Sequence, residues 1–158
     1  MSRLARALVF GCLLWTALLI AAPFAAASAN PSLARAGALV YFAGAFVCHQ
    51  RPERSFHLAG APLPVCARCT GLYVSALAGG LAALVLSTVS TTASRVRCLI
   101  GLAAVPTLLT VVAELFGLAH PSNVVRAVSA LPLGAAAAWA VVSTARRDGI
   151  VSGPRAEI

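Results

Sequence analysis

Three of the five cysteines in this 158-residue chain flank its most polar stretch, which also holds two of its three histidines. Cys48 and His49 open a loop that contains His57, and the segment Cys66-Ala67-Arg68-Cys69 begins after 17 intervening residues. Three sulfurs and one imidazole nitrogen are a common tetrahedral ligand set for zinc. The spacing therefore predicts a metal site, most simply for zinc, with Cys48, Cys66 and Cys69 as ligands and His49 or His57 as the fourth.

The C-x-x-C pair permits a second chemistry. Cys66 and Cys69 stand three residues apart at an expected helix start, so their thiols share one face. The free N–H groups of a first turn and the neighbouring Arg68 favour a thiolate, which is also the reactive form in disulfide exchange. A membrane thiol-disulfide oxidoreductase using Cys66 and Cys69, with Cys48 as a third thiol, is the alternative. A third interpretation involves no chemistry: the cysteines simply pack at the membrane boundary. Whether the protein is an enzyme stays open.

Polar residues also recur at helical spacing near the end of the chain. Glu114 shares a helix face with Thr107 and Thr110, and Asn123, Arg126 and Ser129 form a similar row after a short turn. Ionisable groups at membrane depth face a bundle interior or water. We expect Glu114 and Arg126, with Asn123 beside them, to form a buried polar clamp. The alternatives are two solvated interfacial charges or a proton path that uses Glu114.

The composition is that of an integral membrane protein. Hydrophobic residues make up 60% of the chain, charged residues 10%, and the mean hydropathy is +0.91, against about 25% charged residues in ordinary soluble domains. This excludes a disordered chain and a nucleic-acid-binding domain, and it argues against a soluble enzyme. The formal net charge of +8 comes from arginines that lie mostly between apolar runs, where they fix topology and attract anionic lipid. The expected partners are the bilayer, an anionic lipid and a membrane protein, and an oligomer stays open.

Five apolar runs predict five helices, each to be compared with the roughly 20 residues that cross a bilayer. They cover residues 7–29, 31–48, 66–89, 97–118 and 121–147. The first run also resembles a signal peptide with a small-residue site at Ala27-Ser28-Ala29, whose cleavage would leave four helices. The expected fold is an all-α, polytopic transmembrane bundle. It divides into a first helix or signal-like segment (1–29), a membrane domain with the Cys/His loop at 48–69 (30–147) and a polar tail (148–158).

Two further features bear on assembly and orientation. Gly71, Ser75 and Gly79 form a stripe of small residues that lets another helix approach closely, so a scaffold or complex subunit without site chemistry is a third function class. Arg3 and Arg6 before the first apolar run favour an amino terminus on the inside. With two spans before it, the Cys/His loop is then expected on the cytoplasmic side of a multi-pass protein in the inner (plasma) membrane.

The cysteine segments resemble a known family. The residues from Cys48 to Ser55 (CHQRPERS) and from Pro64 to Tyr73 (PVCARCTGLY) are similar to the signature of small predicted prokaryotic membrane proteins grouped as domain of unknown function 2085. The similarity extends over roughly residues 35 to 140 and includes Ser122-Asn123-Val124-Val125-Arg126. The resemblance implies several membrane helices and no established activity.

Overall fold

The computed structural model describes residues 3–86 and 92–151, and nearly all of them are helical. Five α-helices follow one another, with a short 3-10 helix η1 (Pro52–Arg54) and a two-stranded hairpin, β1 (His57–Leu58) and β2 (Ala61–Pro62), between the second and third. The α-helices are α1 (Arg3–Ala26), α2 (Pro31–Ala45), α3 (Ala67–Val85), α4 (Ala93–Leu115) and α5 (Asn123–Val151). The predicted all-α class with five helices is confirmed. The carboxyl end of the expected polar tail, residues 152–158, lies outside the described residues.

Helix α2 is shorter than the sequence predicts. It begins at Pro31 after the cap Asn30, whose side chain accepts a hydrogen bond from the Ser32 N–H at 2.9 Å, and it ends at Ala45. Its 15 residues extend over about 22 Å, well below the roughly 30 Å of a bilayer core. Helix α2 is not among the four described helices that are long and apolar enough to cross a membrane, so the structure does not support the prediction that this segment crosses it alone. The apolar residues Phe46 and Val47 continue the run but lie in a turn, not in the helix.

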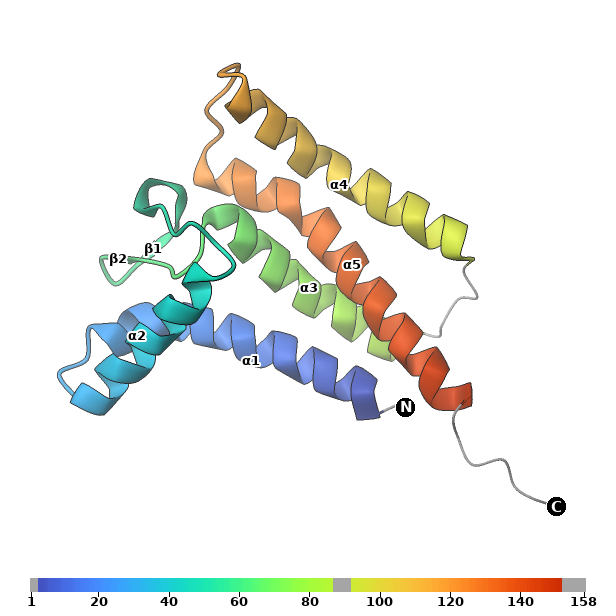
Figure 1. Cartoon of the computed structure of the whole chain (residues 1–158), viewed down its shortest axis with the longest axis horizontal. Coiled ribbons are helices and arrows are strands. Elements are labelled where there is room, and N and C mark those ends of the chain that lie inside the picture. The colour runs from blue at the N-terminus through green and yellow to red at the C-terminus, as the bar shows by residue number, and fades with distance from the viewer. Residues whose placement is uncertain (1–2, 87–91, 152–158) are drawn as a thin grey trace.

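Four helices of the described residues are long and apolar enough to cross a membrane: α1, α3, α4 and the part of α5 up to Arg146. In Figure 1 the start of α1 and the end of α5 lie at one end of the bundle. The start of α3, the end of α4 and the start of α5 lie at the other end, together with the hairpin. The 48–69 loop is thus at the opposite end of the bundle from the start of α1.

Helices α3 and α5 form the closest pair in the bundle. A Cβ added at Gly71 would overlap the backbone of Ala127, and one at Gly79 would overlap the backbone of Ala135. On the other side, a Cβ at Gly134 would overlap the backbone of Leu72. The small-residue stripe of α3 is therefore covered by α5 of the same chain, and the expectation that it forms a surface for another protein is not supported.

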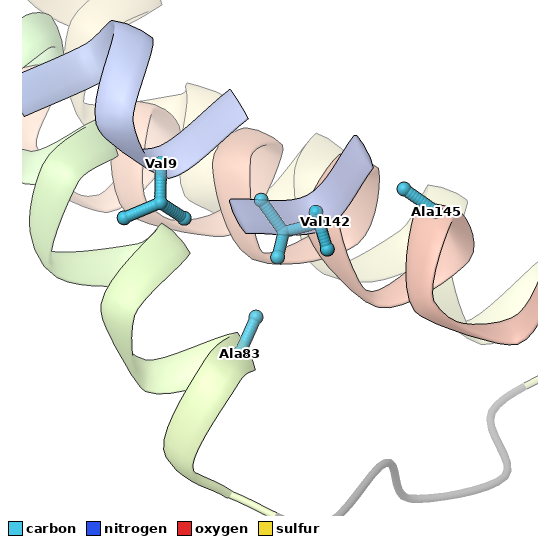
Figure 2. Close-up of a cluster of buried hydrophobic side chains, with 5 residues drawn as sticks. Val9, Ala83, Val142 and Ala145 are labelled. Atoms are coloured by element: carbon cyan, nitrogen blue, oxygen red, sulfur yellow. The ribbon is translucent and has the colours of Figure 1, made fainter. Parts of the chain in front are cut away.

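Small side chains also fill the centre of the bundle. Val9 of α1, Ala83 of α3, and Val142 and Ala145 of α5 are buried in one cluster with Ala5 (Figure 2). Most large apolar side chains instead point outward, and α4 buries only Thr107. This distribution is the reverse of a soluble protein and suits a bundle surrounded by lipid tails.

Candidate metal centre

Three sulfur atoms meet where α2 ends and α3 begins. The Sγ atoms of Cys48, Cys66 and Cys69 all lie within 4.8 Å of one another, and the three residues are half-buried. Three sulfurs bound to one tetrahedral ion at about 2.3 Å would be about 3.8 Å apart. The sulfurs thus need to move by at most about 1 Å relative to one another to share an ion.

The hairpin returns the chain so that these sulfurs can meet. Strands β1 and β2 pair with His57 opposite Pro62, and Ala59 and Gly60 form the turn with positive φ angles of 51° and 78°. After the hairpin, Pro64 and Val65 are fully buried. The loop from Cys48 to Cys66 is therefore a packed unit that fixes where α3 starts.

Gln50 links the two sides of this loop, and the sequence did not single it out. Its Nε2 donates to the carbonyl oxygen of Tyr41 at 2.5 Å and to that of Pro64 at 2.8 Å. The Tyr41 hydroxyl donates to the Pro62 carbonyl at 2.5 Å, while Gly44 leaves room for the backbone of Pro64. Gln50 stands two residues after Cys48, and Pro64 two before Cys66, so these bonds hold the two cysteines opposite each other. A lone glutamine in a loop has no periodic pattern that would have revealed this role.

The sulfur atoms carry hydrogen bonds that favour a thiolate. The backbone N–H of Cys66 donates to Cys48 Sγ at 3.1 Å. A hydrogen bond from the Cys69 side chain lowers the pKa of Cys66 to about 5, with help from Cys48 and the backbone N–H groups of Cys69 and Arg68, although burial acts in the opposite direction. N–H groups at a helix start stabilise negative charge on sulfur, the form that binds a metal.

Beside the sulfurs, one carboxylate holds two arginines. Glu114 Oε1 accepts from Nε and Nη2 of Arg126 at 2.8 and 2.5 Å, and its Oε2 accepts from Nη2 of Arg68 at 2.9 Å. The side chains are 9% exposed for Glu114, 11% for Arg126 and 19% for Arg68. This Glu114 triad therefore ties α4 to both α3 and α5.

The sequence paired Glu114 with Arg126 and assigned Arg68 to topology, to thiol activation and to the attraction of an anionic lipid or partner, but not to Glu114. Arg68 lies between Cys66 and Cys69, and its position on α3 directs it to Glu114 and, at 3.4 Å, to Thr110 Oγ1. The position of Arg68 within the C-x-x-C segment indicated that its surroundings are well defined. Which neighbouring helix it meets depends on packing that no local pattern specifies.

Asn123 joins the triad to the loop. Its Oδ1 accepts from Arg126 Nη1 at 2.9 Å, and its Nδ2 donates to the Ser55 carbonyl at 3.0 Å. Ser55 is itself buried and follows η1. The predicted polar residues at the start of α5 thus contact the same loop that carries the cysteines.

A pocket of about 340 Å³ opens over the cluster. It is lined by the three cysteines and by His49, Arg51, Arg54, Arg68 and Arg126, among others. His49 is exposed at its rim, whereas His57 is exposed in β1 and is not part of the pocket's lining. Among the described residues, neither imidazole belongs to the group of ligand atoms within 4.8 Å.

The bundle and its sulfur cluster define a small polytopic membrane protein with a thiol centre at one end. Residues 48–140 match the family described as "Predicted membrane protein (DUF2085)". The chain belongs to this family, as the cysteine segments had indicated.

Two archaeal relatives are similar to this chain, and both carry the name of uncharacterised proteins. One, from Methanothermobacter thermautotrophicus, is 36% identical over 89 residues, which is 56% of this chain and 78% of the relative. The other, from Methanocaldococcus jannaschii, is 45% identical over 40 residues, 25% of this chain and 26% of the relative. No solved structure matches the chain.

Proposed function

We propose that this membrane protein binds one metal ion, zinc in the first instance, through Cys48, Cys66 and Cys69. The convergence of three thiols from two separate segments of the chain carries this proposal. A disulfide needs only two sulfurs, whereas a tetrahedral ion takes three or four. The hydrogen bond that the Cys66 N–H donates to Cys48 Sγ is the kind of supporting contact that orients a metal ligand.

The fourth ligand we propose is His49. It adjoins Cys48, lines the same pocket as the three sulfurs and is exposed, so its side chain can turn toward them. His57 is the less favoured of the two candidates because it lies in β1. With four protein ligands the ion would be structural: it would tie the end of α2 to the start of α3 and contribute to folding.

Metal content tests this proposal directly. The full chain, purified through a histidine-free tag, should carry about one zinc ion per molecule by elemental mass spectrometry. Each of Cys48→Ser, Cys66→Ser and Cys69→Ser should reduce that content severely. Cys12→Ser and Cys98→Ser are matched controls outside the cluster and should retain the metal. A wild-type protein that takes up no ion, even when refilled with zinc under reducing conditions, would contradict the proposal.

A membrane thiol-disulfide oxidoreductase is the second candidate, and the lowered pKa of Cys66 favours it. In that function Cys66 and Cys69 join in a disulfide while two electrons and two protons pass to an acceptor, such as a membrane quinone or a partner disulfide. The span count matters here as well. With four spans and the amino end inside, as Arg3 and Arg6 favour, the cluster would face the outer side, where disulfides persist.

One labelling experiment separates the two candidates. An impermeant maleimide applied to intact cells, with and without a chelator and a reductant, reports both the side and the state of the thiols. Labelling that requires the chelator supports the metal. Labelling that requires only the reductant supports the redox function and contradicts the metal site.

We also propose that residues 1–29 stay attached as the first span of the protein. Ala5 and Val9 of α1 contribute to the buried cluster of the bundle, which a cleaved signal peptide would vacate. The intact mass of the purified protein tests this, because cleavage near Ala29 would remove the whole of α1.

A further inference from the structure

The pocket over the sulfur cluster has an unusual charge balance. Four arginines line it: Arg51, Arg54, Arg68 and Arg126. Its lining contains no aspartate or glutamate, and two of the arginines, Arg68 and Arg126, share the carboxylate of Glu114. Three thiolates around a divalent zinc ion would add one negative charge. Together with the carboxylate of Glu114 this makes two negative charges, so the four arginines leave a net charge of +2.

Two observations indicate that these arginines have spare binding capacity. Within the described residues, neither Arg51 nor Arg54 forms an ion pair through its side chain. The Arg68 Nε–H is buried and has no hydrogen-bond acceptor in the described part of the chain. A buried donor without an acceptor destabilises the protein, and an oxyanion or water that accepts its hydrogen bond would remove this penalty.

We infer that this pocket binds a phosphate group, presented either by an anionic phospholipid at the membrane boundary or by a small soluble phosphate. Guanidinium groups bind phosphate oxygens in pairs of charge-assisted hydrogen bonds. The pocket lies at the ends of α3 and α5, where a lipid headgroup would be, and basic pockets between membrane helices bind such headgroups. The phosphate site does not require the metal, because the arginines outnumber the carboxylate with or without it.

The test compares two double variants with equal loss of charge. Arg51→Gln with Arg54→Gln removes the two guanidinium groups that have no acidic partner and leaves the Glu114 triad intact. Arg95→Gln with Arg97→Gln is the matched control, because both residues lie in the first turns of α4, at the other end of the bundle. Binding of phosphatidylglycerol, phosphatidylcholine and inorganic phosphate is measured by native mass spectrometry of the full chain in detergent, with and without bound zinc.

We expect wild type to prefer phosphatidylglycerol to phosphatidylcholine and the pocket variant to lose at least about tenfold in affinity, while the control keeps it. If inorganic phosphate at millimolar concentration does not displace bound phosphatidylglycerol, the lipid is the source of the phosphate group. If inorganic phosphate binds and displaces phosphatidylglycerol, the ligand is a soluble phosphate. An equal loss in both double variants, or no phosphate or lipid preference in wild type, would overturn the inference. A zinc-free protein that still binds phosphate supports this site even where the metal proposal fails.

Discussion

Replacing Glu114 by glutamine should destabilise the bundle more than replacing either of its two arginines. The change removes the charge that compensates both Arg68 and Arg126, whose side chains are only 19% and 11% exposed. Breaking a buried ion pair by removing one partner costs about 3–5 kcal/mol. Arg126→Gln, by contrast, leaves Glu114 bonded to Arg68 at 2.9 Å, and its loss of charge-assisted bonds should cost about 1–3 kcal/mol.

The free energy of unfolding can be measured by titrating the purified chain from mild detergent into dodecyl sulfate, with tryptophan fluorescence as the signal. Glu53→Gln is the matched control. Glu53 lies in η1, is exposed and should change the free energy by less than about 0.5 kcal/mol. If Arg126→Gln costs as much as Glu114→Gln, or if Glu53→Gln does, the shared carboxylate is not what holds these helices together.

The same geometry makes a charge exchange informative. Glu114→Arg combined with Arg126→Glu would restore a simple pair between α4 and α5. Because Arg68 also bonds to Glu114, the exchange would place two arginines against each other. We therefore expect the double variant to recover only part of the stability that Glu114→Arg alone loses, and full recovery would show that Arg68 contributes little.

Three further outcomes follow from the site and the helix contacts. Gln50→Ala should weaken zinc binding about tenfold or more without removing a ligand, by analogy with other residues that orient ligands, and unchanged affinity in a competition titration with a chelating dye would contradict its bridging role. In the metal-free protein, the rate at which iodoacetamide alkylates Cys66 should rise as the pH passes about 5, because the lowered pKa of Cys66 means that the reactive thiolate forms at lower pH. A rate that rises only above pH 8 would refute this. Gly79→Val should disrupt the contact of α3 with α5, where a Cβ meets backbone, whereas Gly101→Val has open space around it; equal thermal stability of the two variants would exclude the close contact.

The sequence predicted the long helices well because each contains a long apolar stretch with few charged residues. It failed at α2, where Phe46 and Val47 extend the apolar run beyond the helix end at Ala45. Hydropathy reports whether residues avoid water but not where the backbone turns. The turn here depends on contacts with distant residues, such as the close approach of Gly44 and Pro64.

In the candidate site, too, local patterns were predictable from the sequence and contacts between distant residues were not. The spacing of Cys66 and Cys69 and the nearby Cys48 were enough to predict a shared site, and the structure brings their sulfurs together. The bonds of Gln50 and the Arg68–Glu114 pair span 9, 14 and 46 residues along the chain. Such contacts depend on how the helices are rotated against one another, which no local pattern encodes. For the same reason the stripe of small residues indicated a close helix contact but not that α5 makes it.

The short second helix has a practical consequence for work with this protein. If the four candidate helices α1, α3, α4 and α5 are the spans, one span precedes the thiols, and a reporter fused before α1 or after α5 would sit in the compartment that does not contain them. With that topology, any metal, phosphate or partner that reaches the centre from solution would arrive from the other compartment. Experiments on sealed vesicles therefore need to control which of the two solutions is supplied with the ion.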